Sequence, residues 1–495
     1  MSEGATRPRR DPYRTAVVLT ALLLLTLWRL LVLKGYPLDL HFDEAQYWDW
    51  SRDLAFGYFS KPPLVAWVIA LTTEIAGTTV FGVKLAAPFT HLVTALFLYA
   101  LGRRLYDARA GFFAALLYAT LPAVSLSSMV ISTDPLLVMF WAAGLYTLHR
   151  AVEAPEGGTG WWALTGIALG LGLLAKYTMI AFAGSVVLYL LWAPQARPQW
   201  RTAGPWLALA LGALLIAPNL GWNAANDWIT FAHTGDNASL GGPLLNPGNL
   251  LRFLGSQLGV FGPLTFLALL WLLVHSVREA REPRARFLLA FILPLFVVIV
   301  VQSLLSRANA NWAAPCYVAA AVLVAGRLLE SRAGTWLLQA SIILHLLVAV
   351  AMYNFPVTAD AVGWDLAKQP DPYKKVRGWA ALGDRLMPIC RRHTDRIPAF
   401  DDRELMTEML FYMRPCSTGA VKINPDGAAD DHYDLTRSLR GPAENGYLWF
   451  TVRDDPGLAE RYFEKVETVA VVRVTPRPGL SRTVRVYALD GFKGY

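Results

Sequence analysis

Two adjacent carboxylates and a lysine stand in one short polar segment of an otherwise apolar sequence. Asp43 and Glu44 directly follow an apolar run, and Lys61 precedes two prolines, in the stretch DEAQYWDWSRDLAFGYFSKPP. A carboxylate can serve as general base for an attacking hydroxyl, and a lysine ammonium is a compact cation suited to a phosphate leaving group. The alternative is structural: Asp43 caps a helix that begins at Glu44, and Lys61 reaches lipid phosphates.

Further candidates lie where other apolar runs begin or end. Asp134 stands in STDP, Lys176 in LLAKYT and Arg307 in SRANANW, while Arg52 belongs to the first polar segment. Charges near membrane depth are costly and are usually tied to function or to one another. Lys176 and Arg307 are therefore candidates for binding an anionic headgroup. Capping by Asp134 before Pro135 and snorkelling of the cations are the alternatives.

A histidine and three tyrosines complete the set of candidate residues. His233 lies in WITFAHTGDNASLGGP with Asp236 close by, and a lone histidine is more often a hydrogen-bonded surface residue than a ligand. Tyr47, Tyr58 and Tyr177 stand beside the charged candidates. We consider these four residues as a substrate-binding or metal-binding group.

The elements that position these residues are membrane helices. Of 495 residues, 55% are hydrophobic and only 17% are charged, which is too apolar for an ordinary soluble protein of this length. The formal charge of +8 comes from short loops between apolar runs, so it does not indicate a nucleic-acid partner.

Apolar runs long enough to cross a bilayer predict about eleven transmembrane helices by this length rule. The runs are 15–34, 80–101, 110–127, 133–150, 161–175, 177–193, 203–220, 251–275, 286–305, 312–328 and 334–353. No small-residue cleavage site follows the first run, so we expect it to remain as an anchor.

The distribution of basic residues predicts the orientation, because cytoplasmic loops hold an excess of lysine and arginine. One set of connections carries Arg7, Arg9, Arg10, Arg14, Arg103, Arg104, Arg109, Arg150, Arg197, Arg201, Arg278, Arg281, Arg284, Arg286, Arg327 and Arg332. The other set has only Lys34, Arg52, Lys61, Lys176 and Arg307. We therefore expect a cytoplasmic amino terminus and an outer loop at 35–79. Residues 62–77 are expected to form an interfacial helix; if they crossed the membrane, every later orientation would be inverted.

The chain divides into a transmembrane part, 1–354, and a soluble α/β domain, 355–495, which we expect on the periplasmic side. The second part has an amphipathic stretch at 373–388 and strand-like runs at 447–452 and 467–474. Cys390 and Cys416 both belong to it, whereas Cys316 lies in an apolar run. A disulfide is open only to the first two, and the sequence does not decide whether it forms.

The segment from Asp43 to Pro63 resembles the first periplasmic loop of bacterial GT-C glycosyltransferases. This superfamily includes protein O-mannosyltransferases, lipid A aminoarabinose transferases and galacturonosyltransferases of the lipid A core. The shared pattern is an acidic pair, an aromatic-rich helix and a Lys-Pro, and it continues more weakly through SSMVISTDP, LLAKYT and SRANANW. The resemblance implies a GT-C fold and lipid A or other envelope glycosylation at the bacterial inner membrane.

The resemblance also implies the chemistry. A sugar would pass from a polyprenyl phosphate of the undecaprenyl type to a lipid, glycan or protein acceptor by inverting displacement. Asp43 would be the catalytic base, with Asp134 facing the same cavity, and Lys61 would hold the carrier phosphate with help from Arg52 or Lys176. In aminoarabinose transferases an acidic residue before the Lys-Pro and a later histidine hold a metal. Ser60 occupies that acidic position here, which leaves a divalent metal ion open.

Two other classes of protein remain as alternatives. A secondary transporter or flippase of a lipid-linked or anionic substrate would also be polytopic, although such proteins often show inverted repeats that we do not find. A membrane-anchored sensor would leave the acidic pair and the Lys-Pro unexplained. Nucleotide-binding glycine motifs are missing from the sequence, which agrees with a donor already activated on a lipid.

Overall fold

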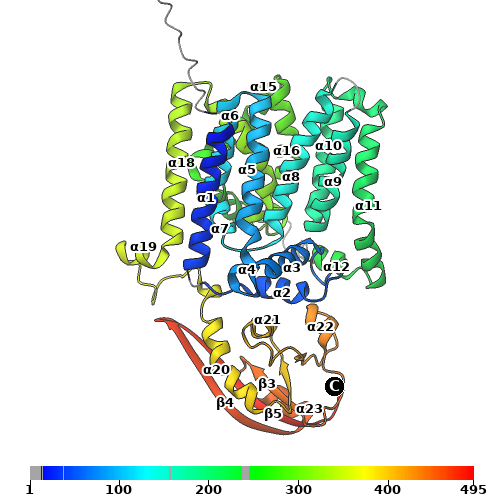
Figure 1. The fold of residues 1–495 in the computed structure, drawn as a ribbon, viewed down its shortest axis with the longest axis vertical. Helices are drawn as coiled ribbons and strands as arrows, with labels where there is room; N and C mark the ends of the chain where they lie inside the picture. Colours follow the sequence, from blue (N-terminus) through cyan, green and yellow to red (C-terminus); the bar gives the residue numbers. More distant parts are fainter. Residues whose placement is uncertain (1–12, 14, 37, 155–157, 237–244) are drawn as a thin grey trace, which may run out of the picture.

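The computed structural model describes residues 13, 15–36, 38–154, 158–236 and 245–495. A bundle of upright helices stands above a small domain built on a sheet, and a layer of short helices lies between them (Figure 1). The arginines expected before the first helix, Arg7, Arg9, Arg10 and Arg14, lie outside the described residues. The cavity discussed below lies at the end of the bundle that faces the sheet domain.

The upright helices cover most of the predicted apolar runs. They are α1 (Thr15–Gly35), α5 (Ala86–Leu105), α6 (Ala108–Thr120), α8 (Thr133–Glu153), α9 (Thr159–Ala175), α10 (Ile180–Trp192), α11 (Gly204–Ala225), α14 (Pro263–Val274), α16 (Pro283–Leu305), α17 (Ala314–Leu328) and α18 (Arg332–Tyr353). Among the described helical segments, five are long and apolar enough to cross a membrane by themselves, and others are shorter. The chain is therefore a polytopic α-helical membrane protein, while the number of eleven spans stays a prediction.

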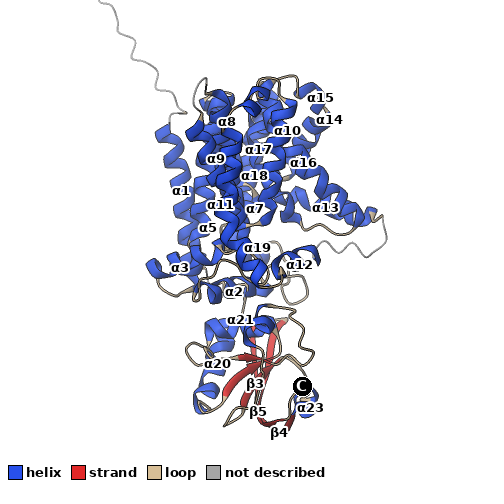
Figure 2. Ribbon diagram, turned by 90° about the vertical axis from the view of Figure 1, so that its right-hand side faces the viewer, coloured by secondary structure: helices blue, strands red, loops and turns tan. Residues whose placement is uncertain are grey.

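Two predicted runs are broken in the structure. The run 251–275 forms α13 (Pro247–Val260) and α14, separated at Gly262, whose φ of +85° only glycine adopts easily, and Pro263 then starts the new helix. Figure 2 shows α13 inclined to the upright helices. The run 110–127 likewise divides into α6 and α7 (Pro122–Ser127), because Pro122 cannot donate the backbone hydrogen bond that would continue α6.

The outer loop folds into α2 (Phe42–Ser51) and α3 (Leu64–Ala76), which lie across the lower end of the bundle (Figure 1). The predicted run 80–101 begins with a short helix beside them, α4 (Val80–Lys84), before α5. With thirteen residues, α3 is too short to span a bilayer, and its Leu71 and Ile75 side chains are exposed. The helix expected within 62–77 is present as α3, and its position at the membrane interface stays a prediction.

Shorter elements connect these helices or flank the tail. They are η1 (Tyr177–Met179), η2 (Arg197–Arg201), α12 (Ile229–Asp236), α15 (Ser276–Glu279), η3 (Ala310–Ala313), α19 (Phe355–Ala361) and η4 (Lys374–Val376).

The tail domain is a five-stranded mixed sheet with helices. Its elements are α20 (Trp379–Arg392), β1 (Ile397–Phe400), α21 (Arg403–Tyr412), β2 (Val421–Lys422), α22 (His432–Arg437), β3 (Tyr447–Thr451), α23 (Gly457–Tyr462), β4 (Phe463–Arg477) and β5 (Leu480–Phe492). The strand order is β2-β1-β3-β5-β4; β1 runs parallel to β2 and β3, and β5 runs antiparallel to β3 and β4. The amphipathic stretch becomes α20, and both predicted strands are present.

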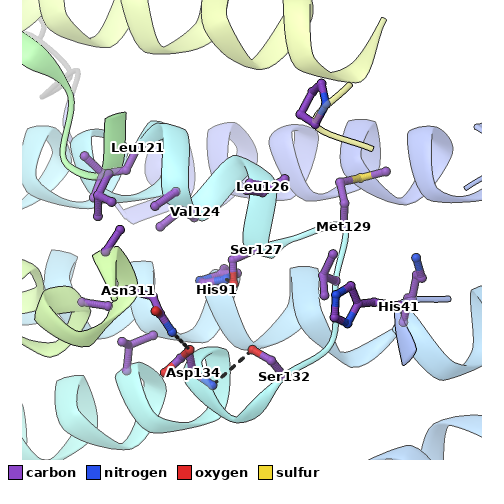
Figure 3. Close-up of a pocket in the computed structure, with 18 of the residues that line it drawn as sticks. His41, His91, Leu121, Val124, Leu126, Ser127, Met129, Ser132, Asp134 and Asn311 are labelled. Atoms are coloured by element: carbon purple, nitrogen blue, oxygen red, sulfur yellow. Dashed lines mark hydrogen bonds between the residues drawn. The ribbon is translucent and has the colours of Figure 1, made fainter. Parts of the chain in front are cut away.

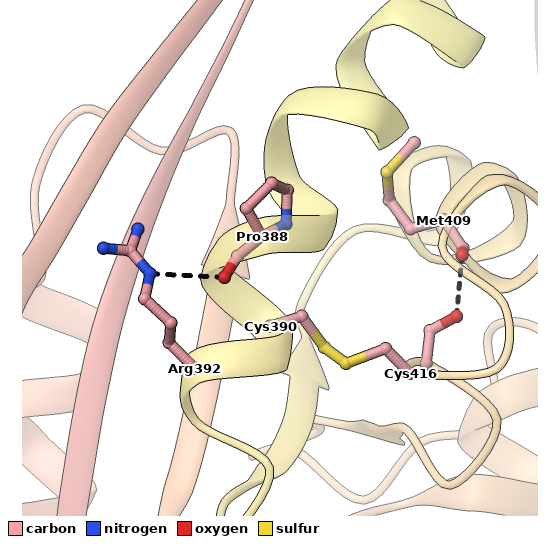
Figure 4. Close-up of a disulfide and its surroundings, with 6 residues drawn as sticks. Pro388, Cys390, Arg392, Met409 and Cys416 are labelled. Carbon is pink, nitrogen blue, oxygen red and sulfur yellow. Dashed lines mark hydrogen bonds between the residues drawn. A yellow bond between two sulfur atoms is a disulfide. The ribbon is translucent and has the colours of Figure 1, made fainter.

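One disulfide joins two helices of the tail. Cys390 at the end of α20 is bonded to Cys416, which follows α21 (Figure 4). Leu386, Met409 and Phe450 belong to the hydrophobic core beside it. The bond therefore ties the two helices together on the same core.

Candidate active site

A cavity of about 680 Å³ opens between the outer loop and the bundle. Its lining comes from α2, the Lys-Pro turn before α3, the start of α8, the junction of α9 and α10, α16 and η3. The charged or titratable lining residues are His41, Asp43, Glu44, Lys61, Asp134 and Lys176, with Tyr47 and Tyr177 beside them. The lining residues run from His41 to Trp312, so the structure brings together residues that are up to 271 positions apart in the chain.

Asp43 lies in the first turn of α2, with its side chain 40% exposed toward the cavity. His41, and not Asp43, is the N-cap: the Asp43 backbone N–H donates to His41 Nδ1 at 3.3 Å, and Glu44 Oε2 accepts the His41 N–H at 2.9 Å. Burial lowers the pKa of His41, which favours the neutral imidazole that this cap requires. Asp43 is therefore not needed to cap the helix.

The two oxygens of the Asp43 carboxylate have different surroundings. Oδ1 accepts a hydrogen bond from Arg403 Nη2 at 2.8 Å, and Arg403 belongs to the tail domain. Oδ2 lies 3.7 Å from His41 Nδ1, beyond hydrogen-bond distance. Oδ1 is thus held by Arg403, whereas Oδ2 has no close donor among the described residues, and the Asp43 side chain lines the cavity.

Glu44, the next residue in the chain, is completely buried, and both of its carboxylate oxygens have partners. Its Oε2 lies 3.2 Å from the buried Lys84 ammonium, and its Oε1 accepts the Ile131 backbone N–H at 2.8 Å. Lys84 also donates to the Asp39 carbonyl at 3.0 Å. Glu44 therefore joins α2 to the segment before α8, and its chemical environment differs sharply from that of Asp43.

Lys61 enters the cavity from the turn between α2 and α3. Burial lowers the pKa of its ammonium first of all, and the nearby Lys176 charge adds to this effect. No hydrogen bond or ion pair to this ammonium is present among the described residues. Lys61 is therefore a partly desolvated cation with its hydrogen-bonding capacity unused.

Lys176 is paired. Its ammonium lies 2.6 Å from Asp134 Oδ1, and Asn311 donates to Asp134 Oδ2 at 2.7 Å. Ser132 caps α8 by accepting the Asp134 backbone N–H at 3.3 Å, so capping does not use the Asp134 carboxylate. Both carboxylate oxygens of Asp134 thus have partners.

A second cavity of about 500 Å³ adjoins the first (Figure 3). Its walls are mainly apolar and include Leu121, Val124, Leu126 and Met129. Both cavities are lined by His41, Val130, Ser132, Asp134 and Asn311. The hydrogen-bonded Asp134 and Asn311 side chains therefore stand at the border between them.

The three candidate tyrosines divide between the cavity and the support behind it. Tyr47 and Tyr177 line the cavity, and the Tyr177 hydroxyl donates to Asn219 Oδ1 at 2.8 Å while its ring stacks on Phe231. Tyr58 is buried, stacks on Trp50 with ring centroids 4.5 Å apart, and donates to the Trp50 carbonyl. Tyr58 supports the loop and is absent from the cavity lining.

Three other candidates lie outside the lining of this cavity. Arg52 ends α2, pairs with Asp49 at 3.2 Å and lies over the Trp48 ring, at a separate surface pocket. Arg307 is exposed, whereas Asn309, Asn311 and Trp312 after it line the cavity. His233 packs 5.2 Å from the Phe59 ring, and its neighbour Thr234 lines the cavity instead.

The residues do not form a recognisable metal site. Ser60 lines the cavity where a carboxylate would be the better metal ligand, and no group of three or more metal-ligating side chains occurs in the described part of the chain. The residues present therefore do not fit the metal site that the resemblance suggested, as far as they are described.

Sequence reasoning missed Arg403, Lys84 and Asn311. Arg403 lies 360 residues from Asp43, in a domain whose sequence carries no motif for the site. Asn311 belongs to the SRANANW segment, in which only Arg307 was selected as a candidate. No local signal identified Arg403, because its role depends on how the tail docks on α2.

With this geometry in hand, comparisons with known proteins identify the relatives of the chain. Residues 60–222 match the family described as dolichyl-phosphate-mannose-protein mannosyltransferase. Lipid A galacturonosyltransferase RgtD of Rhizobium johnstonii is 30% identical over 429 residues, which cover 86% of this chain and 89% of that protein. The undecaprenyl phosphate-alpha-4-amino-4-deoxy-L-arabinose arabinosyl transferase of Pseudomonas aeruginosa is 32% identical over 34% of this chain and 31% of its own length.

Solved structures show the same fold at low identity. ArnT from Cupriavidus metallidurans bound to undecaprenyl phosphate superposes with a TM-score of 0.64 and 17% identity, over 95% of this chain and 97% of that one. The Archaeoglobus fulgidus oligosaccharyltransferase tethered to an acceptor peptide gives a TM-score of 0.53 and 13% identity, over 93% of this chain and 73% of that one. These relatives lend no support to the transporter alternative.

Proposed function

We propose that this chain, which belongs to the GT-C superfamily of glycosyltransferases, transfers a sugar from a polyprenyl phosphate to an acceptor hydroxyl in the 680 Å³ cavity. The observation that supports this proposal is that two available groups line one cavity. They are the Asp43 carboxylate, which has one oxygen without a close donor, and the Lys61 ammonium, which has no partner among the described residues. One group can take a proton and the other can hold a departing phosphate.

The mechanism is an inverting displacement. The acceptor oxygen attacks the anomeric carbon from the face opposite the phosphate while Asp43 Oδ2 takes the hydroxyl proton. The bond between the anomeric carbon and the phosphate oxygen breaks, and its electron pair leaves with the polyprenyl phosphate. Lys61 stabilises the charge that develops on that phosphate, and the paired Lys176, which lines the same cavity, adds positive potential.

The two adjoining cavities support a division between the substrates. The charged cavity also contains Leu295, Val298 and Ile299 of α16, and the exposed Val298 side chain offers the polyprenyl tail a path into the lipid. The apolar second cavity has room for the hydrocarbon part of a lipid acceptor. Asp134 and Asn311 would then separate the two substrates near the reacting groups.

The orientation proposed from the basic residues agrees with the position of the cavity. Arg104 and Arg327 lie in the last turns of α5 and α17, and Arg284 lies in the first turn of α16, at helix ends away from the tail domain. An excess of positive charge favours the cytoplasmic side. The cavity and the tail domain would thus face the periplasm of a bacterial inner membrane.

Glu44, Arg52, Tyr58, Arg307 and His233 receive no direct chemical role in this proposal. Glu44 and Tyr58 hold the loop that carries Asp43 and Lys61, and no step passes through a metal ion. This leaves four groups at the reacting centre, Asp43, Lys61, Asp134 and Lys176.

A reconstituted transfer reaction tests the proposal. The purified chain in detergent is given a labelled polyprenyl-phosphate sugar together with an acylated glycolipid, a free glycan or a peptide, and products are measured by mass spectrometry. We expect a glycosylated product without sealed vesicles. Movement of the labelled carrier across sealed vesicles, without any product, would instead identify a transporter. Envelope lipids from cells with and without the protein would identify the sugar by its missing mass.

A further inference from the structure

The most unusual contact at the site joins the tail domain to the proposed base. Arg403 Nη2 donates to Asp43 Oδ1 at 2.8 Å, and Arg403 Nε donates to Gln46 Oε1 at 2.7 Å. Asp43 and Gln46 are one helical turn apart on α2, so the guanidinium spans one face of that helix. The Arg403 guanidinium also lies 5.0 Å from the centre of the Phe42 ring. Three contacts therefore fix its position.

The sheet of the tail positions this arginine firmly. Strand β1 is the middle partner of β2 and β3 and ends at Phe400, and α21 begins at Arg403. Asp402 caps α21 by accepting the Leu405 backbone N–H at 2.7 Å. Asp401 is held by Trp449 at 3.1 Å and by Arg453 at 2.6 Å. Arg403 thus extends from a short turn that is anchored on both sides.

The surface between α21 and α2 contains buried aromatic side chains and a hydrogen bond between the two parts of the chain. Phe411 meets the Trp48 ring edge-on with centroids 4.9 Å apart, and the Tyr412 hydroxyl accepts the Leu40 backbone N–H at 2.8 Å. Phe411 is buried in the same cluster as Tyr47 and Trp50. The tail therefore docks on the catalytic loop through a fixed surface, and it brings Arg403 to Asp43 in a defined geometry.

We propose that the tail domain completes the catalytic site, with Arg403 as a positioning residue that holds Asp43 Oδ1 and turns Oδ2 toward the acceptor hydroxyl. This inference rests on the proposed role of Asp43 as base. A carboxylate side chain without a partner can rotate among several orientations. A hydrogen bond from the guanidinium to Oδ1 restricts this rotation and so fixes the position of Oδ2. The transmembrane part alone would hold its substrates but would present them with a poorly oriented base.

The same interface supplies a matched control. Arg437 of α22 also reaches from the tail to a carboxylate of α2, with Nη2 at 3.4 Å from Asp49, but Asp49 does not line the catalytic cavity. Removing either arginine deletes one cation from the docking surface. Only the Arg403 change acts on Asp43.

The test compares full-length wild-type protein with Arg403→Ala, Arg403→Lys and Arg437→Gln in the transfer reaction. We expect Arg403→Ala to lower kcat about 10-fold or more, with the KM for the sugar donor changed less than about twofold, because binding groups are intact. Arg403→Lys should recover part of kcat, and added guanidinium ion should partly restore Arg403→Ala. Arg437→Gln should keep kcat within about twofold of the wild type.

Two results would overturn the inference. One is a wild-type kcat for Arg403→Ala, and the other is a loss of activity that follows melting temperature equally in the Arg403→Ala and Arg437→Gln variants. If Arg403→Ala does not fold, the guanidinium-to-ammonium change in Arg403→Lys carries the comparison, with an unchanged kcat again counting against the inference. An inactive Asp43→Asn beside a fully active Arg403→Ala would reject only the tail's role, whereas an active Asp43→Asn would reject the proposed base itself.

Discussion

The Lys176 ammonium lies 2.6 Å from Asp134 Oδ1, so one of the two lysines that line the 680 Å³ cavity is already paired with a carboxylate. Lys61, which also lines this cavity, has no such partner among the described residues. This asymmetry assigns the two cations different tasks. Lys61 is available to a phosphate, and Lys176 orders the wall that Asp134 and Asn311 form between the cavities.

Lys61 should set an alkaline limit on the use of the sugar donor. Burial and Lys176 lower the pKa of Lys61, so its charge is present below that lowered pKa and is lost as pH rises through it, earlier than for an exposed lysine at about 10.4. The kcat/KM profile for the donor should therefore fall at high pH. Lys61→Arg, which stays charged, should shift that fall to higher pH, and Lys61→Ala should raise KM about 10-fold or more at pH 7.

If kcat/KM falls at the same alkaline pH in Lys61→Arg and in the wild type, the fall is not caused by deprotonation of Lys61. Equal and mild effects of Lys61→Arg and Lys61→Ala on KM would remove this residue from the phosphate site.

The Asp134–Lys176 pair should behave as a unit in a double-mutant cycle. Lys176→Met leaves the Asp134 carboxylate without its cation, and we expect a loss of about 1 to 3 kcal/mol in the free energy of unfolding; the loss is below that of a fully buried pair because a fifth of each side chain is exposed. Adding Asp134→Asn should recover much of the stability without recovering transfer activity. Additive losses of stability in the double variant would show that the two groups are not coupled.

Glu44 should matter for folding, in contrast with its neighbour. Glu44→Gln leaves the buried Lys84 charge unpaired, which typically costs about 3 to 5 kcal/mol, so the melting temperature should fall clearly. The protein that remains folded should keep its KM for the sugar donor. A variant with normal stability but no turnover would assign Glu44 to the chemistry instead.

The sequence predicted the parts of this site that are local or that follow the membrane. Apolar run length and basic loops predicted the membrane helices, and the cost of charge near the bilayer selected Asp43, Lys61, Asp134 and Lys176, which share one cavity. The same rule also selected Arg307, and the family resemblance added Arg52, because neither the rule nor the resemblance can tell which way a side chain points. The Arg52 side chain instead forms an ion pair with Asp49 at the end of α2, and Arg307 is exposed.

Long-range contacts account for most of what the sequence did not predict. Asp43 and Glu44 look equivalent in the chain, but α2 starts at Phe42, so Glu44 turns back to its N-cap and to Lys84 while Asp43 faces the cavity. Arg403 reaches Asp43 through the docking of two domains, which no local pattern records. The break at Gly262 was missed because the residues around it are mostly apolar and continue one long run.

The most direct measurement of the central claim is single-turnover transfer by Asp43→Asn beside carrier binding by the same protein. The amide keeps the size of the side chain but cannot accept the acceptor's proton, so we expect the transfer rate to fall about 100-fold or more. The Kd for polyprenyl phosphate should stay within about twofold of the wild type, since Lys61 and Lys176 are unchanged. Near-normal turnover by Asp43→Asn would contradict the assignment of Asp43 as the base.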